Sequence, residues 1–291
     1  MRILVLGASG QLGKCLHDQL SQLNLKAYFK SKKDLDLLHY DDIKGIVKEM
    51  NPNIIINASA YTKVDEAENN IDLANKVNNL AVANLSNVCF ENNSTLIHVS
   101  TDYVFDGNAK QPYTSNSKTN PTGIYGKTKL KGEIKIAKSG CNYIIIRTAW
   151  LYSEYNNNFL KTILHLASTK DEISVIYDQI GTPTYAQDLA KAIVSTFTTI
   201  KSVDTIKDLY HYSGDEVCSW YEFATKILKI AESIGLQSSP KIKKIKSKEY
   251  ITLTKRPKYS VLDSSNFYKK FNVAPSNLEN GIKKSILALA N

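Results

Sequence analysis

Cysteine is sparse in this chain, with four residues in 291, none of them in a C-x-x-C pair or near a histidine cluster. Scattered cysteines of this kind predict reduced, mostly buried thiols and exclude a disulfide framework. No apolar run approaches the ~20 residues that cross a bilayer. The N-terminus enters an apolar segment without the basic start and cleavage site of a signal peptide. We therefore expect a cytoplasmic protein.

The sequence also lacks a nucleic-acid-binding signature, although its net charge is +9 and lysine carries most of it. We find no helix-turn-helix, zinc-finger or RNA-binding motif. The densest basic cluster, 241–248, is interleaved with isoleucines and contains no aromatic platform, which favours a solvated face. We expect neither a nucleic-acid nor a membrane partner. A phosphorylated small molecule remains compatible with the charge.

The N-terminal segment carries the first motif. The apolar run 3–6 is typical of a buried parallel strand, and a helix-like stretch covers 14–23. Between them, Gly7 would allow a tight turn, Gly10 close approach of a pyrophosphate, and Gly13 packing of the helix against the strand. The helix N-terminus would offer free N–H donors to the phosphates. This G-x-x-G-x-x-G variant predicts a dinucleotide site; the alternative is a turn that needs glycine for geometry alone.

Strand-like and helix-like segments alternate through the first half of the chain, with further strands expected at 27–29, 53–57, 94–100 and 143–147. This alternation predicts an α/β fold, a Rossmann-type doubly wound parallel sheet. The less regular second half predicts a smaller C-terminal α/β substrate domain. We expect residues 1–149 and about 170–203 to form the dinucleotide-binding domain, and about 150–169 and 204–291 the substrate-binding domain. The cleft between them is the default site.

Small, hydroxyl or aromatic side chains follow four of the expected strands. Ligands bind beyond the carboxyl ends of strands in open parallel sheets, so these residues should meet at one edge. They are Gly7, the segment 58–62, the segment 100–102 and the segment 148–150.

A tyrosine and a lysine form the candidate catalytic pair. Tyr125 and Lys129 are four residues apart and share a helix face. A fixed ammonium favours the phenolate and lowers the tyrosine pKa from its usual ~10. The Thr101 hydroxyl, if folded beside them, can hydrogen-bond a substrate carbonyl oxygen. Such a set can protonate that oxygen while a hydride arrives at carbon. Each feature alone is common: Y-x-x-x-K recurs by chance, and Thr101 alone reads as a capping hydroxyl.

The segment after the second strand bears on the coenzyme. An acidic residue at this place favours NAD, and a basic one tolerates the extra phosphate of NADP. Residues 29–33 include three lysines and no carboxylate, and the first acid is Asp34. We therefore expect NADPH to be used at least as well as NADH.

Together these motifs resemble the extended short-chain dehydrogenase/reductase family, and within it the reductases of dTDP-linked keto sugars. The resemblance runs nearly end to end. Its most specific strings are S-T-D-Y-V-F-D-G at 100–107 and D-Q-I-G-T-P-T at 178–184; others lie at 7–13, 57–68, 121–133, 147–152, 157–159, 219–224 and 256–257.

The resemblance implies reduction of the C4 keto group of dTDP-4-dehydro-β-L-rhamnose to dTDP-β-L-rhamnose, the last step of that sugar's synthesis, with NADPH or NADH. One alternative is reduction of another dTDP-4-keto-6-deoxysugar. Another is a non-catalytic regulatory subunit resembling the beta subunit of methionine adenosyltransferase. The complete set of Thr101, Tyr125 and Lys129 argues against the regulatory reading, because a protein kept only for binding needs no proton donor.

The resemblance also implies residue roles. Tyr125 would donate the proton, Lys129 would hold the nicotinamide ribose and tune Tyr125, and Thr101 would orient the keto group. The implied cofactor contacts are Gly7, Gly10, Gln11, Leu12 and Gly13 at the diphosphate, Asp36 and Leu37 at the adenine, Ala60, Tyr61 and Thr62 at the nicotinamide, and Tyr125 and Lys129. The implied substrate contacts are Thr101, Asp102 and Trp150, the last offering a flat apolar surface.

One property of some family members is not expected here. Their magnesium-dependent dimer is held by glutamates near the end of the chain. The segment 278–285 has one glutamate, so we predict no metal. The expected partner is a dTDP-sugar, and a homodimer is left open.

Overall fold

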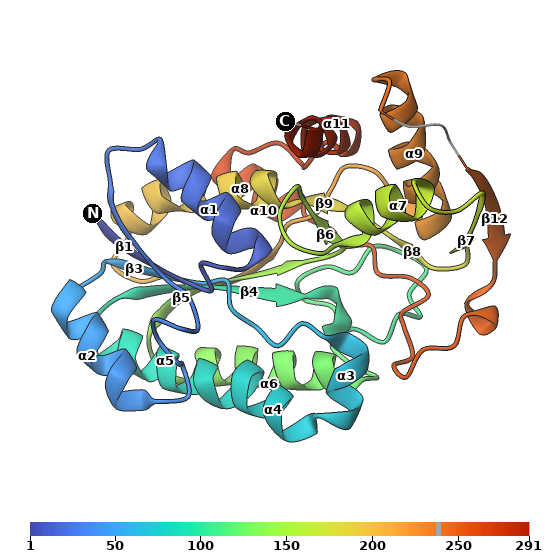
Figure 1. Cartoon of the computed structure of the whole chain (residues 1–291). Coiled ribbons are helices and arrows are strands. Elements are labelled where there is room, and N and C mark those ends of the chain that lie inside the picture. Colours follow the sequence, from blue (N-terminus) through green and yellow to red (C-terminus); the bar gives the residue numbers. More distant parts are fainter. Residues whose placement is uncertain (237–239, 291) are drawn as a thin grey trace.

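The structure, a computed structural model, describes residues 1–236 and 240–290. Within these residues, a six-stranded parallel sheet runs through the middle of the molecule in the order β10-β5-β4-β3-β1-β2 (Figure 1). In chain order its strands are β1 (Arg2–Leu6), β2 (Lys26–Lys30), β3 (Ile54–Asn57), β4 (Thr95–Thr101), β5 (Asn142–Thr148) and β10 (Lys207–His211).

The inner strands are apolar on both faces. Residues 54–56 of β3 and 144–146 of β5 are runs of isoleucine, and all but one of these side chains are fully buried. β-Branched residues fit a pleated surface, and a strand covered on both sides needs no alternation with polar residues. The apolar run 3–6 forms most of β1, as predicted.

Helices cover both faces of the sheet, which confirms the doubly wound α/β fold (Figure 1). One face is covered by α1 (Gln11–Ser21), α8 (Ala186–Ser202) and α10 (Ser265–Phe271). The other is covered by α2 (Tyr40–Met50), α3 (Val64–Asn69), α4 (Ile71–Asn75), the π-helical η1 (Lys76–Leu80), α5 (Ala81–Glu91) and α6 (Ile124–Lys138). A 3-10 turn, η2 (Asp102–Val104), follows β4 directly.

A smaller unit lies beyond the carboxyl ends of the strands (Figure 1). Its own apolar cluster packs α7 (Phe159–Ala167), α9 (Trp220–Ser233) and α11 (Leu278–Ala290) together. Short strands complete it: β6 (Leu151–Tyr152) with β9 (Thr184–Tyr185), β7 (Glu172–Ile176) with β12 (Lys241–Ile245), and β8 (Ile180–Gly181) with β11 (Cys218–Ser219). A 3-10 turn, η3 (Ser247–Glu249), follows β12.

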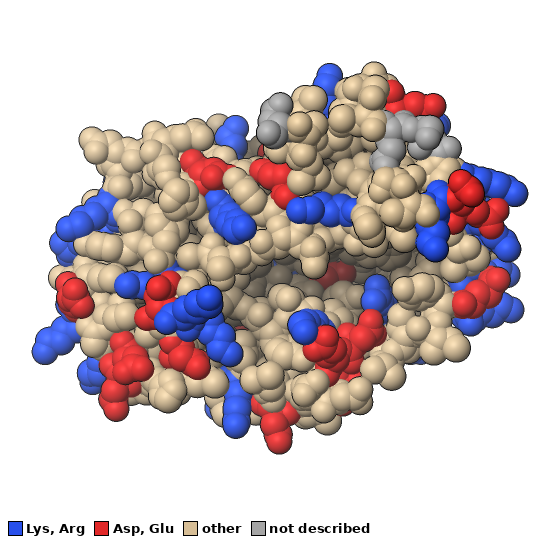
Figure 2. All heavy atoms as spheres, viewed as in Figure 1, with Lys and Arg blue, Asp and Glu red and all other residues tan. Residues whose placement is uncertain are grey.

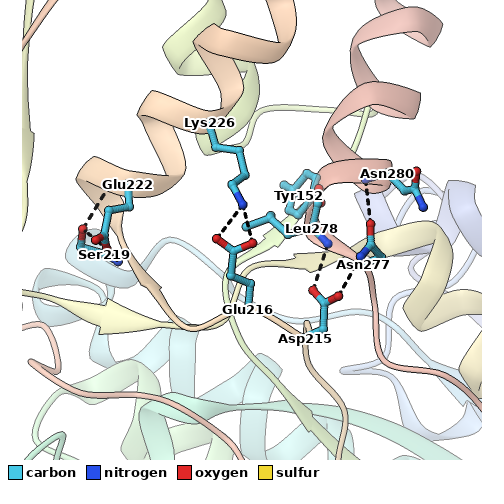
Figure 3. A network of polar contacts seen from close by, with 9 residues as sticks. All are labelled: Tyr152, Asp215, Glu216, Ser219, Glu222, Lys226, Asn277, Leu278 and Asn280. Carbon is cyan, nitrogen blue, oxygen red and sulfur yellow. Dashed lines mark hydrogen bonds and ion pairs between the residues drawn. The ribbon is translucent and has the colours of Figure 1, made fainter.

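Polar contacts fix the starts of α9 and α11 (Figure 3). Ser219 and Glu222 form a capping box that satisfies the first N–H groups of α9. Asp215 accepts from the backbone N–H of Leu278 at 3.1 Å, and Tyr152 donates to the Leu278 carbonyl oxygen. Glu216 pairs with Lys226 on α9. One short segment therefore holds two helices of the smaller unit in place.

The strand pairing differs from the expected domain division at two strands. We expected 170–203 to belong with the sheet, but β7 pairs with β12 and its side chains join the apolar cluster of the smaller unit. We expected 204–291 to belong with the smaller domain, but β10 is the edge strand beside β5. The reason is topological: α8 supplies the crossover that a parallel strand requires, so the chain returns to the sheet after it.

The four cysteines are free and buried, which confirms the expectation of reduced, buried thiols. Burial raises the pKa of the Cys218 thiol to about 12. In the described part of the chain, no helix combines the length and the apolar character needed to cross a membrane.

Candidate functional site

The turn after β1 requires glycine. Gly7 has a φ of +83°, and a Cβ there would lie 2.7 Å from the Ser59 nitrogen. A Cβ on Gly13 would lie 2.1 Å from the Gly7 carbonyl oxygen, so α1 packs against the turn only because that atom is missing. Helix α1 then begins behind Gly10, which has no side chain to cap it. Its first N–H groups and the positive end of its dipole suit a phosphate.

A loop of the smaller unit contacts this turn. Asn158 donates to the side-chain oxygen of Gln11 at 2.8 Å, and Asn156 donates to the Ser9 carbonyl oxygen at 3.0 Å. Each contact joins residues 147 positions apart. The sequence analysis did not assign either asparagine to the site, because no local pattern reports a contact at this separation.

The end of β2 lies beside the same turn, since the Lys30 carbonyl oxygen accepts from the Gly7 nitrogen at 3.0 Å. The Asp34 carboxylate accepts from the backbone and hydroxyl of Ser31, and these bonds lower the Asp34 pKa. Asp34 is therefore an acid already paired within its own loop. Asp36 similarly accepts from the backbone N–H of Leu38, and Leu37 is half-buried against the core under α2 and α5.

The segment 58–62, which includes Ala60 and Thr62, leaves β3 next to Gly7 and is tied to α6. Asn78 of η1 accepts from the Tyr61 nitrogen at 2.8 Å and donates to the Tyr61 carbonyl and the Thr128 hydroxyl, each at 3.2 Å. Asn78 is another residue that the sequence analysis did not assign. π-Helical turns are often found at functional sites, but no sequence signal distinguishes one from an α-helix.

Tyr125 and Thr101 meet, although they come from α6 and β4. Burial raises the pKa of Tyr125 to about 12, a hydrogen bond with the Thr101 side chain opposes that rise, and the nearby Asp102 carboxylate adds to it. Thr101 is buried and also donates to an Asp102 carboxylate oxygen at 3.0 Å. Burial raises the pKa of Asp102 to about 6. The structure thus brings a phenol, an alcohol and a carboxyl group together.

Lys129 lies one turn further along α6 and is 1 % exposed. Its Nζ donates to the Val99 carbonyl oxygen at 2.7 Å and lies 3.2 Å from His98 Nε2. We expected the ammonium to lower the pKa of Tyr125. In this structure burial dominates and the Tyr125 pKa is raised, because Lys129 points its Nζ at β4. Burial also lowers the Lys129 pKa to about 8, which the Glu133 carboxylate opposes.

Trp150 is half-buried and lies between the sheet and the smaller unit with a φ of +48°. Its ring stacks on Trp220 with centroids 3.5 Å apart and planes 6° apart. A Cβ on Gly181 would lie 2.5 Å from the same ring, so Gly181 packs closely against it. Trp220 and Gly181 therefore cover part of the ring that we expected to offer a flat apolar surface, and its contact with a substrate stays a prediction.

A cavity of about 620 Å³ is lined by residues from 176–179 and 246–258. Five of its lining residues are basic: Lys246, Lys248, Lys255, Arg256 and Lys258. Arg256 binds the Asp65 carboxylate of α3 at 2.9 Å, and Glu68 of α3 accepts from the Ile124 nitrogen at 2.9 Å. Figure 2 shows this face of the molecule hollowed between α3 and α7. Lys246 and Lys248 belong to the cluster 241–248 and are exposed, as predicted, while the sequence analysis did not assign a role to Lys255, Arg256 or Lys258.

The residues present fit a dinucleotide. The glycine turn is a cradle that side chains would fill, and the helix behind it begins without a side-chain cap. Two buried hydroxyls at the ends of β4 and β5, Ser100 Oγ and Thr148 Oγ1, have no hydrogen-bond partner among the described residues. Buried hydroxyls without partners call for a ligand group. Within 1–236 and 240–290, no group of three or more His, Cys, Asp or Glu residues is placed to hold a metal ion.

The comparisons agree with this geometry. The family model described as "RmlD substrate binding domain" matches residues 1–291. A dTDP-4-dehydrorhamnose reductase from Aggregatibacter actinomycetemcomitans is 37% identical over 97% of both chains. The crystal structure of a dTDP-4-dehydrorhamnose reductase from Clostridium acetobutylicum matches with a TM-score of 0.92 and 35% identity over 100% of both chains.

A further solved structure bears on the cofactor. The dTDP-4-dehydrorhamnose reductase from Bacillus anthracis, solved in complex with NADP, matches with a TM-score of 0.91 and 35% identity over 99% of both chains. The resemblance found in the sequence is therefore confirmed over the whole chain. This protein belongs to the RmlD substrate binding domain family, together with the dTDP-4-dehydrorhamnose reductases.

Proposed function

We propose that this protein reduces the C4 keto group of dTDP-4-dehydro-β-L-rhamnose to give dTDP-β-L-rhamnose. The observation that carries the proposal is the meeting of Tyr125 and Thr101 at the strand ends that also hold the glycine turn. The names of the full-length relatives supply the substrate. A purely regulatory role would not require a buried phenol paired with an alcohol.

The coenzyme site is formed by Gly7, Gly10, Gln11, Leu12 and Gly13 at the diphosphate, with Asp36 and Leu37 near the adenine and Ala60, Tyr61 and Thr62 near the nicotinamide. When bound, the reduced nicotinamide supplies the hydride that reaches C4. We propose NADPH as the preferred coenzyme. Asp34 is turned onto Ser31, and Lys30, Lys32 and Lys33 surround that loop, so a 2′-phosphate meets cations.

Tyr125 donates its proton to the keto oxygen as the carbon is reduced. A pKa of about 12 keeps the phenol protonated at neutral pH, which suits an acid. Thr101 would turn its hydroxyl from the Asp102 carboxylate to the same oxygen when the substrate is bound. Lys129, while it is protonated, would support the charge change on Tyr125 and hold the nicotinamide ribose. General acid work of this kind contributes ~10²–10⁴-fold, and positioning of sugar and coenzyme supplies much of the remainder.

The nucleotide half of the substrate lies along the basic cavity. Two phosphates would meet the positive charge of the lysines that line it. Arg256 of this cavity binds Asp65 of α3, and Glu68 of the same helix contacts the start of α6, which carries Tyr125. Asp102 and Trp150 contact the sugar nucleotide between the cavity and Tyr125. A homodimer and a cytoplasmic location stay predictions.

The test is a direct assay. Purified protein is mixed with dTDP-4-dehydrorhamnose and either NADPH or NADH, the loss of reduced-nicotinamide absorbance is followed, and the product's stereochemistry is determined by NMR. We expect dTDP-β-L-rhamnose and a KM for NADPH no higher than that for NADH. A different sugar would show a sister reductase of another keto sugar. Absence of turnover with both coenzymes would contradict the proposal, and strict NADH dependence would contradict the coenzyme preference.

A further inference from the structure

A line of buried polar groups connects the end of β3 to Lys129. The Ser59 backbone nitrogen donates to Asn57 Oδ1 at 3.1 Å, and Asn57 Nδ2 lies 3.1 Å from His98 Nδ1. His98 Nε2 in turn lies 3.2 Å from Lys129 Nζ. Asn57 and Lys129 are each 1 % exposed and His98 is 0 % exposed. In groups buried this deeply, a donor that faces another donor is costly, so contacts that pair a donor with an acceptor are favoured.

The backbone decides which way the Asn57 amide is turned. A backbone N–H can only donate, so the Asn57 atom that faces Ser59 is the oxygen. The Ser59 hydroxyl donates to the same oxygen at 2.6 Å. The amide nitrogen of Asn57 therefore faces His98, and an amide nitrogen can only donate. His98 Nδ1 must then be the acceptor and carries no proton.

The protonation of one ring nitrogen of His98 decides what the other ring nitrogen offers to Lys129. Burial lowers the pKa of His98 well below its usual range, with the charge of Lys129 as a second cause, so the ring is neutral. A neutral ring without a proton on Nδ1 carries it on Nε2. This N–H points at Lys129 Nζ. An ammonium offers only donors, whereas an uncharged amine offers the lone pair that the N–H needs.

We propose that Asn57 and His98 are positioning residues that favour the uncharged amine of Lys129. Asn57 fixes the Nε2–H tautomer of His98, and that N–H accommodates the amine better than the ammonium. The inference goes beyond the proposed function and rests on it only where it treats Lys129 as catalytic. On this proposal, the buried His98 limits the pH range over which Lys129 is charged.

Other charged groups around Lys129 do not replace this contact. Glu133, one turn further along α6, favours the ammonium, but its carboxylate is already bonded to Arg147 of β5 at 2.6 and 3.0 Å. Tyr125, one turn back on α6, is neutral near pH 7 because its pKa is raised. His98 is the titratable group of β4 in contact with Nζ.

The tautomer can be measured without any activity. Side-chain ¹⁵N NMR of histidine-labelled protein distinguishes a protonated from a bare ring nitrogen for each of the five histidines. The His98 signals are identified by their loss in His98→Gln, or by replacing the other four histidines one at a time if that variant does not fold. We expect a bare Nδ1 and a protonated Nε2. A protonated Nδ1, or a ring charged near pH 7, would overturn the proposal.

An isosteric change at Asn57 should reverse the donor and acceptor roles along this row of buried polar groups. In Asn57→Asp, one carboxylate oxygen still accepts from Ser59 and the other accepts from His98, so the ring proton moves to Nδ1. His98 Nε2 then accepts from the Lys129 ammonium. We expect the NMR tautomer to switch and the basic limb of the kcat–pH profile to move up by at least about one unit.

The double variant Asn57→Asp, His98→Leu separates the tautomer from the added charge. Leucine neither donates nor accepts a hydrogen bond, so any remaining shift in the double variant reports the carboxylate alone. We expect the shift to be clearly smaller than in Asn57→Asp. Equal shifts, or an unchanged tautomer in Asn57→Asp, would refute the inference. If the protein lacked reductase activity, the proposed function would fail while the NMR result still decided the tautomer.

Discussion

The ion pair between Glu133 and Arg147 offers the sharpest test of how the site is supported. It joins α6 to β5 directly behind Lys129. The two side chains share two hydrogen bonds, at 3.0 and 2.6 Å, and each is 4 % exposed. The Arg147 guanidinium also lies over the Phe105 ring at 5.1 Å. An isolated charge at this depth would have neither water nor a partner.

Removing one partner should therefore destabilise the protein more than removing both. Glu133→Leu leaves Arg147 buried and unpaired, and Arg147→Met leaves Glu133 buried and unpaired. Each single variant should lower the free energy of unfolding by about 3–5 kcal/mol. The double variant replaces the pair with apolar groups, and methionine retains a favourable contact with Phe105. Buried ion pairs often stabilise a protein little more than apolar replacements do. The free energy of unfolding of the double variant should therefore lie within about 1–2 kcal/mol of that of the unchanged protein.

The assay is urea unfolding of the four proteins at pH 7, followed by circular dichroism, with the coupling energy taken from the cycle. A surface pair, Lys63 and Glu66, serves as the control, since both side chains are more than half exposed. Its removal should change stability by less than about 1 kcal/mol. Losses below about 1 kcal/mol in the Glu133 or Arg147 single variants would refute the reasoning. A double variant whose loss of stability equals the sum of the two single losses would also refute it.

Further outcomes follow from the site. Tyr125→Phe keeps the ring and removes the acid, so turnover in the coupled assay should fall by at least ~10²-fold while the NADPH Kd, from fluorescence titration, changes little; near-normal turnover would contradict the assignment. Gly13→Ala places a Cβ 2.1 Å from the Gly7 carbonyl oxygen, so thermal unfolding should show a loss of about 1–3 kcal/mol and less stabilisation by NADPH. The Lys129 pKa of about 8 lies below its usual range, so the ammonium fraction and kcat should fall as pH rises past about 8; a flat profile to pH 10 would exclude an ammonium requirement. Lys255→Ala should raise the KM for the dTDP-sugar by about tenfold, and the remote Lys201→Ala should not.

The features predictable from sequence are those encoded locally. We could predict the glycine turn, the isoleucine-rich strands and the residues that follow each strand, because each depends on neighbours within a few positions. The approach of Thr101 to Tyr125 was also predictable. Parallel strands bring their carboxyl ends to one edge, and the helix that carries Tyr125 packs back along β4.

Long-range features escaped the sequence analysis for a physical reason. The contact of Asn158 with Gln11 depends on how the smaller unit sits against the sheet, and no periodicity encodes that arrangement. The cluster 241–248 was expected to be a solvated face. The lysines of β12 are exposed, and so are Lys246 and Lys248 just beyond it, which confirms that prediction; that these two also line a cavity depends on segments far away in the chain. The raised pKa of Tyr125 was missed because burial depends on packing, which a four-residue spacing does not report.

The central claim is that hydride reaches C4 of the sugar in this site. The most direct measurement uses NADPH deuterated at the transferring position, dTDP-4-dehydrorhamnose and the unchanged protein, with the product analysed by NMR and mass spectrometry. We expect one deuterium, bonded to C4 of dTDP-β-L-rhamnose. A product without the label, or with deuterium at another carbon, would contradict it.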